Sequence, residues 1–483
     1  MKKAIVSAMV FLLGSVSAFA QQKMTQDEFM AKVARNNPEI ISADRSFEAL
    51  AKKARELDTM YETSLNASGS YTDDRSGLSF TSPFQTSDTS VTMYSVGLSK
   101  KNTYGTSMSL AYTGVITNLD LYAPMAIPGY PGIFSTIGAY SVKPTLSVSQ
   151  SLIKDTKNGQ TQANINKTKA LMLSGQYQQL FVRQQALLKA RTAYLNLSLS
   201  RDVINFRRLS LERASRVLEW TKRRVDLDLA ENADYLEAQA GYKLRQLNLQ
   251  TAQEDEVRAQ RNFNEVIGST GAVADYDLEK ISDLVSCCDV GSLARSGLRA
   301  DVLAAQEQLS ASILAEREAS MRVSAEVSAF GSTGFSGLAL DYTDANRQAF
   351  SFEKPDYTVG LNISVPLGYS LNNTVKEGYR KDVEAAEQML AKAKLSADNN
   401  WDDLSANWKN VKDRLQMARD IQDVQSRRVE SEQKRFQRGR TTTFLVLNAE
   451  NDLDDATLSV YRLIFEELLT KAQAELFNTK PIQ

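Results

Sequence analysis

The chain has 483 residues, with 57 basic and 58 acidic side chains, a formal net charge of −1 and no histidine. This balanced charge gives no reason to expect a nucleic-acid partner. Without histidine the chain lacks the commonest metal ligand and the commonest general base, which argues against most hydrolases and metalloenzymes.

Residues 1–20 read as a secretory signal peptide. Two lysines precede the apolar run from Ala4 to Leu13, and small residues follow at Ser17, Ala18 and Ala20. No later stretch approaches the roughly 20 apolar residues that a transmembrane helix needs. We therefore expect an exported protein without a spanning helix.

The rest of the chain is an internal duplication. Residues 39–71 align without a gap on 301–333, residues 146–153 match 361–368, and residues 224–239 match 435–450. The order predicts a first repeat over 21–280, a connector over 281–297 and a second repeat over 298–483. Each repeat reads as a helix, strands, a very long helix and a shorter helix. A repeat that cannot bury its apolar faces alone favours a symmetric, wall-like assembly over an enzyme built around one pocket.

Strands are expected at about 64–152 and about 323–367. Apolar residues at Tyr357, Val359, Leu361 and Ile363 alternate with small or polar residues, as in a membrane barrel that faces lipid outside and water inside. A soluble sandwich would give the same period, but the signal peptide and the long helices favour the barrel. The first repeat has an extra hairpin at about 90–116, which the pattern allows either inside the barrel or outside it.

Helical hairpins are expected at about 159–267 and about 373–478, with tips near 226–232 and 437–443. No proline lies between Thr145 and Lys354 or between Leu367 and Lys480, and an interior proline costs a helix about 3 kcal/mol. Leucines in these intervals recur with coiled-coil spacing. Asn232 and Thr442 are the expected N-caps of the second helices. Cys287 and Cys288 are adjacent and read as connector thiols of either redox state, without a redox role.

These features together resemble the outer-membrane efflux protein (TolC) family. The resemblance rests on Asn37-Pro38-Glu39 opening the first helix, on LSVSQSLI and LNISVPLG at the passages from strand to helix, and on Arg435-Phe436-x-x-Gly439 at the second tip. The fold it implies is mostly α with β. Outer-membrane β-barrel strands, four from each chain, are combined with long periplasmic coiled-coil hairpins in a homotrimer. Four strands cannot enclose an aqueous pore, so several copies must share one barrel.

The resemblance also implies where function lies. A selectivity ring near the periplasmic end would be carried by Asp234 and Glu237, whose counterpart in the second repeat is Asn448. Leu229 and Gly439 would meet a periplasmic adaptor protein, and through it an inner-membrane pump. The family's glycine is replaced by Asp228 at the first tip, which puts a standard turn there in doubt.

Complementary charges at the tips suggest a lock that holds the closed state, formed by Asp226 and Asp228 with Arg438 and Arg440. The apolar tip residues Leu227, Leu229, Phe436 and Phe444 are expected to pack inside the hairpins, and the alternative is that they dock a partner.

The predicted function is an outer-membrane exit duct of a tripartite efflux pump or a type I secretion system. It has no catalytic residues, metal or cofactor, and its partners are outer-membrane lipid, the adaptor and the pump. A phosphate-binding loop of the GxxxxGK[ST] type is absent, so energy must come from elsewhere. One alternative is a trimeric coiled-coil protein with a structural or adhesive role. An exported enzyme is the other, and the lack of histidine argues against it.

Overall fold

The computed structural model describes residues 22–75, 85–122, 134–155, 159–269, 276–286, 293–480 and 482. The chain forms two compact units. The first unit takes the described residues of 1–45, 179–300 and 395–483, and the second takes those of 46–178 and 301–394. Each unit therefore mixes segments of both repeats. The signal peptide, Cys287 and Cys288 lie outside the described residues.

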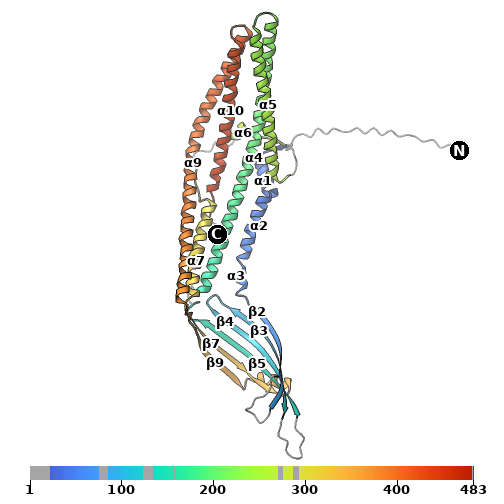
Figure 1. Cartoon of the computed structure of the whole chain (residues 1–483), viewed down its shortest axis with the longest axis vertical. Coiled ribbons are helices and arrows are strands. Elements are labelled where there is room, and N and C mark those ends of the chain that lie inside the picture. Colours follow the sequence, from blue (N-terminus) through green and yellow to red (C-terminus); the bar gives the residue numbers. More distant parts are fainter. Residues whose placement is uncertain are drawn as a thin grey trace, which may run out of the picture. The chain divides into compact units, whose positions relative to one another are not determined.

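Long helices occupy the intervals without proline (Figure 1). The helix α6 (Ile281–Ser286) lies in the predicted connector, and the helices of the first repeat are α1 (Gln26–Asn36), α2 (Pro38–Lys53), α3 (Glu56–Thr59), α4 (Gln160–Asp226) and α5 (Asn232–Ile267). Those of the second are α7 (Ala300–Arg322), α8 (Tyr342–Ala349), α9 (Tyr369–Gln437), α10 (Thr443–Ala474) and the 3-10 turn η1 (Glu475–Phe477). The two helical hairpins are thus α4 with α5 and α9 with α10, and α4 and α9 have 67 and 69 residues. The mainly helical fold with two related halves is confirmed.

The second unit contains an antiparallel sheet. Its strands are β2 (Ser64–Asp74), β3 (Gln85–Lys101), β4 (Thr106–Tyr122), β5 (Phe134–Ser151), β7 (Glu326–Phe335), β8 (Gly337–Ala339) and β9 (Pro355–Ser364). They lie side by side in the order β2-β3-β4-β5-β7-β9, and β8 pairs with β5 (Figure 1). The first and last strands of this path have one partner strand each.

The additional hairpin of the first repeat is β3 and β4, and it lies inside the sheet. Along its length β3 pairs with β2, and β4 pairs with β5. The sheet path therefore contains six strands, whereas the family resemblance implied four. Neighbouring strands of a sheet are about 4.8 Å apart. If β3 and β4 did not lie between them, an unfilled gap of about three such spacings would separate β2 from β5.

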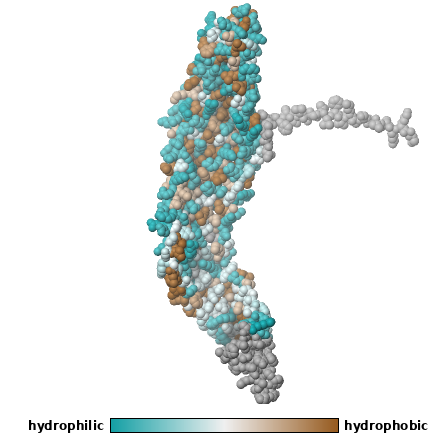
Figure 2. Space-filling model, in the orientation of Figure 1, coloured by the Kyte–Doolittle hydropathy of each residue, from teal (hydrophilic) through white to brown (hydrophobic). Residues whose placement is uncertain are grey.

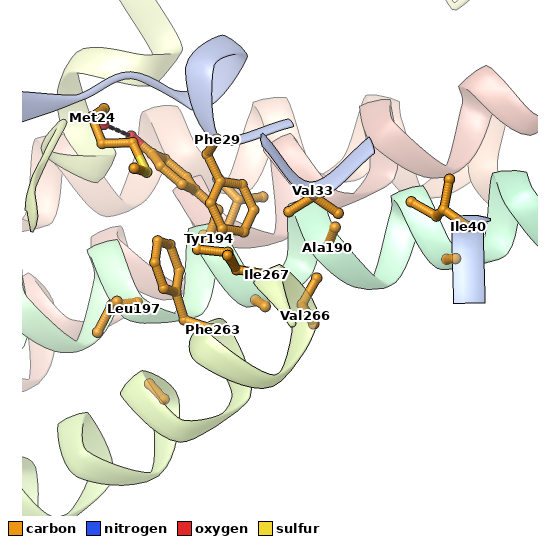
Figure 3. Packing of buried hydrophobic residues seen from close by; sticks show 14 of the residues in the cluster. Met24, Phe29, Val33, Ile40, Ala190, Tyr194, Leu197, Phe263, Val266 and Ile267 are labelled. Carbon is orange, nitrogen blue, oxygen red and sulfur yellow. Dashed lines mark hydrogen bonds between the residues drawn. The ribbon is translucent and has the colours of Figure 1, made fainter. Parts of the chain in front are cut away.

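Residues near the N-terminus of the described chain build the core of the first unit (Figure 3). The rings of Phe29 and Phe263 stack with centroids 4.4 Å apart, and the Phe29 and Tyr194 centroids are 5.3 Å apart. The Tyr194 hydroxyl donates to the Met24 carbonyl oxygen at 3.0 Å. Met24 ends β1 (Gln22–Met24), which pairs in parallel with β6 (Tyr276–Leu278). This core joins α1, α4 and α5 to the segment before α6.

The pairing of β1 with β6 was not predicted, and one helix start was placed wrongly. Asn37-Pro38-Glu39 opens α2, because α1 already precedes it. Asn37 Oδ1 accepts hydrogen bonds from the backbone N–H groups of Glu39 and Ile40, which caps α2, and the fixed φ of proline suits the first helical position.

Candidate functional site

Both hairpin tips turn with the same backbone conformation. Asp228 and Gly439 have positive φ values of 58° and 69°. The Leu229 N–H donates to the Arg224 carbonyl at 2.8 Å, and the Arg440 N–H donates to the Arg435 carbonyl at 2.9 Å. This is the helix-ending pattern that glycine favours and aspartate tolerates. The doubt raised by Asp228 was therefore wrong, because the first tip forms the standard turn.

The second helix of each hairpin begins as a capped helix. Thr442 Oγ1 accepts from the Leu445 N–H at 3.4 Å, which confirms Thr442 as an N-cap. Asn232 is instead the first helical residue of α5, and the cap is Glu231. Asp234 Oδ2 accepts from the Glu231 N–H at 3.3 Å, so this carboxylate stabilises the positive end of the helix.

The residues predicted for selectivity lie directly after the tips. Asp234 and Glu237 are both half-buried on one face of α5, and Asn448 is exposed on α10. The structure thus brings the two carboxylates together on one helix, and their role in a ring stays a prediction.

The residues predicted for the lock and for docking all lie at the exposed tips. Asp226, Asp228, Arg438 and Arg440 are exposed, as is Gly439. Within the described tips of this single chain, no ion pair joins the two aspartates to the two arginines. A lock between hairpins of neighbouring copies stays a prediction.

The expectation that the apolar tip residues pack inside the hairpins is wrong for three of them. Leu227, Leu229 and Phe444 are 68%, 64% and 53% exposed. Only Phe436 is buried, in a cluster with Val217, Ala238, Val446 and Leu447 that joins the two hairpins. The exposed side chains lie on the turn and on the outer face of α10, where nothing in the single chain covers them.

A cluster of buried charges lies next to this apolar cluster, farther from the hairpin tips. We call it the buried charge cluster, and its members are Arg207, Arg213, Arg245, Glu450 and Asp454. Arg213 Nε contacts Glu450 Oε2 at 2.6 Å, and Arg213 Nη2 contacts Asp454 Oδ1 at 3.2 Å. The side chain of Glu450 is only 2% exposed and that of Asp454 only 7%. Each carboxylate has a further donor, Gln433 for Glu450 and Ser210 for Asp454.

The buried charge cluster ties both hairpins together. Arg207 and Arg213 belong to α4, Glu450 and Asp454 to α10, and Arg245 to α5. Arg245 is 2% exposed, and burial lowers its pKa while the two carboxylates act in the opposite direction. Sequence reasoning missed these residues. The sequence did contain one signal for them. Arg207, Ser210 and Arg213 are spaced three apart, and Glu450 and Asp454 four apart, so each set lies on one face of its helix.

The sheet has one apolar face and one polar face. The apolar face carries Leu65, Ala67, Tyr71, Tyr94, Val96, Leu98, Met108, Leu110, Tyr112, Val142, Leu146, Val148, Tyr357, Val359, Leu361 and Ile363. The polar face carries Asn66, Ser68, Ser70, Ser95, Ser99, Ser109, Thr113, Lys143, Thr145, Ser147, Ser328, Ser332, Thr358 and Asn362, with Val91, Met93, Ala111, Val115, Leu119, Ala139 and Phe330 as apolar members. The predicted alternation is therefore present in the paired strands.

Most of the apolar face is uncovered in the single chain. Val359 is 88% exposed, Tyr357 is 72% exposed and Leu65 is 71% exposed. Figure 2 shows hydrophobic atoms at the surface of the sheet region as well as among the mostly hydrophilic side chains of the helices. No second sheet packs on this face within the described residues. Within the described residues the sheet is therefore not one layer of a two-sheet sandwich.

One short helix covers part of the apolar face, and it was not predicted. Ala345 and Ala349 of α8 pack on Val142, and the Tyr112 hydroxyl donates to Asn346 Oδ1 at 2.5 Å. Gly337 permits this approach, since a Cβ there would lie 1.8 Å from the Ala345 carbonyl oxygen. The α8 helix thus covers the apolar strand segments farthest from the long helices.

The described residues contain neither a catalytic metal site nor a spanning helix. They hold no group of three or more histidine, cysteine, aspartate or glutamate side chains that could bind a metal ion. Among the helices described, none combines the length and the apolar character needed to cross a membrane.

Comparison with known families identifies the second repeat. Residues 299–476 match the model of the outer membrane efflux protein family. The resemblance to that family is confirmed. The outer-membrane efflux protein match places the chain in the outer membrane, with its long helices in the periplasm.

Solved structures share the fold of this chain at low sequence identity. The outer membrane protein VceC of Vibrio cholerae is 13% identical, with a TM-score of 0.65 over 94% of this chain and 95% of its own. The Campylobacter jejuni CmeC outer membrane channel is 12% identical, with a TM-score of 0.61 over 94% and 85%. The open-state Neisseria gonorrhoeae MtrE outer membrane channel is 11% identical, with a TM-score of 0.61 over 94% and 88%. No curated protein matches the chain.

Proposed function

We propose that the chain is the exit duct of a tripartite efflux pump or a type I secretion system. It acts as a homotrimer, conducts passively, and is gated at its periplasmic hairpin tips. An adaptor protein meets the tips, and an inner-membrane pump supplies the energy. The observation that carries this proposal is a sheet with one polar face, one uncovered apolar face and two unpaired edge strands.

Each of these features answers a requirement of a shared pore. In hydrocarbon every backbone N–H and C=O group needs a partner, so an open sheet edge must be closed by another strand. The apolar face suits lipid and the polar face suits water. A chain with two unpaired edges, at β2 and β9, meets these requirements only when copies join.

The tips support gating and docking. Leu227, Leu229 and Phe444 expose large apolar side chains beside the oppositely charged pairs Asp226 and Asp228, Arg438 and Arg440. An apolar centre with a charged rim is the usual composition of a protein interface. Leu229 and Gly439 therefore stay the proposed docking residues, and the charges stay the proposed lock.

A structural or adhesive protein is the weaker alternative. A coiled-coil fibre needs long heptads, but it does not need two hairpins that reverse with the same turn at Asp228 and Gly439. It also does not need a polar sheet face such as that formed by Ser68, Ser95 and Thr113.

The proposal is tested by fractionation and by deletion. We expect the protein in the outer-membrane fraction, a detergent-solubilised mass of three chains, and ion conductance in planar bilayers. A strain lacking it should become more sensitive to toxic compounds or lose a secreted protein. A monomer that stays in solution without detergent would contradict the proposal. A membrane trimer without conductance or transport defect would favour the structural role.

A further inference from the structure

The apolar face of the sheet records the level of the membrane. One row of residues crosses all six strands of the sheet path at right angles, and we call it the reference row. Its members are Leu65, Leu98, Leu110, Leu146, Thr333 and Tyr357. Positions on different strands can be compared by their distance along the strand from this row.

Four tyrosines on the apolar face lie at increasing distances from the reference row, going from β9 to β2. Tyr357 lies in the row on β9, Tyr112 lies two residues beyond it on β4, Tyr94 four residues beyond on β3, and Tyr71 six residues beyond on β2. All three displacements point away from the long helices that flank the sheet. Tyr140 on β5 lies six residues beyond the row, and both Tyr140 and Tyr112 contact Tyr342 of α8.

The overall displacement from β9 to β2 can be converted into a strand tilt. A drift of six residues over five strand-to-strand steps, at about 3.3 Å per residue and about 4.8 Å per step, corresponds to a tilt of about 40°. Strands of transmembrane barrels tilt by about 35–45° and carry aromatic girdles at the membrane surface. Two of these tyrosines, Tyr94 and Tyr112, belong to the additional hairpin, which therefore carries aromatic side chains on the same face as β2 and β9.

Side chains of the additional hairpin are divided between the same apolar and polar faces as those of β2 and β5. Val96, Leu98 and Leu110 lie on the apolar face. Ser95 and Thr113 lie on the polar face, where their hydroxyl oxygens are 3.3 Å apart. A hairpin that projected into water would have no reason to keep an apolar face in line with β2 and β5.

We infer that all six strands, β3 and β4 included, form the wall of the pore, and that the ring closes by pairing of β2 in one copy with β9 in the next. The inference rests on the proposed function, which supplies the shared barrel. It assigns this chain a wall segment of six strands.

The two edge strands fit each other. Because directions alternate along six strands, β2 and β9 of neighbouring copies run antiparallel. The two strands have 11 and 10 residues. A register with Tyr71 of one copy opposite Tyr357 of the next keeps both tyrosines on the apolar face. In that register Ser64 lies opposite Ser364 and Asp73 opposite Pro355, so the strands overlap along their length and apolar residues share one face.

Closure of the six strands within one chain is excluded by size. Barrels of about eight strands are already filled by their own side chains, so six strands leave no lumen. Barrel diameter grows roughly linearly with strand number, so three copies of six strands enclose a lumen about half again as wide as three copies of four. The mouth of this duct is therefore wider than a four-strand chain would give.

Disulfide trapping tests the closure. In a background with Cys287→Ser and Cys288→Ser, Asn66→Cys with Asn362→Cys places two polar-face cysteines opposite each other across neighbouring copies. We expect oxidation to give covalent dimers and trimers on denaturing gels, reversed by a thiol reductant. The matched control, Asn66→Cys with Leu361→Cys, puts the thiols on opposite faces and should stay monomeric on the gel.

Labelling of single cysteines tests the hairpin. With the protein in liposomes, Ser95→Cys on the polar face should react with a water-soluble maleimide, whereas Leu98→Cys on the apolar face should be protected by lipid. Ser68→Cys and Leu65→Cys on β2 are the corresponding controls. Equal reaction at Ser95→Cys and Leu98→Cys in a membrane trimer, or no cross-link in that trimer, would overturn the inference alone. A water-soluble monomer would overturn the proposed function as well.

Discussion

At the scale of single residues, the buried charge cluster is the feature whose disruption should cost the most stability. Charged groups in a protein interior lose their hydration, and they are tolerated only when partners compensate them. Arg213 compensates both Glu450 and Asp454, whose carboxylates are almost completely buried. Removing one member therefore costs far more than breaking a surface pair, although the intact cluster need not add net stability.

Replacement of Arg213 should destabilise the hairpins strongly. Arg213→Met leaves Glu450 without its cation, and we expect a loss of about 3–5 kcal/mol in the free energy of unfolding. The control is Arg216→Met one turn later, because Arg216 and Glu212 are 61% and 62% exposed and such pairs are worth under about 1 kcal/mol. Denaturant unfolding followed by helical circular dichroism measures both. Equal losses in the two variants would refute the importance of burial.

Asp202 should make stability depend on pH. Burial raises its pKa above the ordinary value, while its Oδ2 accepts a hydrogen bond from the Ile281 N–H at 2.9 Å. The folded state therefore binds this proton more tightly than the unfolded chain does. The resulting stabilisation is complete below the unfolded pKa near 3.8 and is lost as pH rises through the raised folded pKa.

The variant that isolates this effect is Asp202→Asn, which keeps an oxygen acceptor and removes the charge. We expect the thermal midpoint of the variant to rise relative to that of the parent protein as pH rises from 4 to 7. Below pH 4 this difference should become small. Asp277→Asn, at an exposed position of β6, is the control. A constant difference between Asp202→Asn and the parent protein at all pH values would speak against a raised pKa.

At the scale of elements, local signals in the sequence located the helices and strands. Proline-free intervals and heptads placed α4, α5, α9 and α10 within a few residues, and alternation gave the two faces of the sheet. The pairing of β1 with β6 was missed because each strand has three residues, too few for a periodic pattern. The buried charge cluster was missed because its partners are more than 200 residues apart, from Arg213 to Glu450.

The α8 helix illustrates the same limit. Its eight residues carry few apolar side chains, and what holds it is the small size of Ala345, Ala349 and Gly337 at the contact with the sheet. Small residues that permit close approach are visible only once the partner surface is known. The tip turns were predictable in position, but the conformation of Asp228 required the backbone.

The tip turn at Gly439 should be weakened by a single methyl group. No atom lies within 4 Å of a Cβ built on Gly439, so Gly439→Ala changes only the cost of its positive φ, about 1 kcal/mol. We expect the Arg440 amide, which closes this turn, to exchange its hydrogen roughly fivefold faster.

Two matched variants should shift in the opposite direction. Gly378→Ala, in the third turn of α9, also meets no atom within 4 Å, and it should slow exchange around it because alanine favours the helix. Asp228→Gly should strengthen the first tip by removing the strain of a left-handed aspartate. If Gly439→Ala leaves exchange at the second tip unchanged, the turn is not held by glycine.

At the scale of the whole molecule, the two carboxylates after the first tip are repeated in each copy of an oligomer. A ring of acidic side chains in a narrow throat lowers the energy of cations and raises that of anions. Since the counterpart of Glu237 in the second repeat is Asn448, the ring would draw its charge from the first repeat alone.

Neutralising these carboxylates should reduce cation preference. For Asp234→Asn with Glu237→Gln, we expect the reversal potential in a planar bilayer under a potassium chloride gradient to move toward zero. The control is Glu254→Gln, exposed on the same helix α5 but more than four turns away from Glu237. An unchanged reversal potential in the double variant would remove Asp234 and Glu237 from the selectivity site.

The chain passes between its two compact units four times, each time inside a helix: α2, α4, α7 and α9. Neither unit can therefore be excised as a fragment by cutting loops, and fragments made for biochemistry would expose severed helices. Folding also depends on contacts between distant parts of the sequence, because Gln22 pairs with Tyr276 and Arg207 forms an ion pair with Asp454. Contacts of such long range form slowly. A newly exported polypeptide would expose apolar surface until almost its last segment has been translocated. Periplasmic chaperones should therefore determine its folding yield.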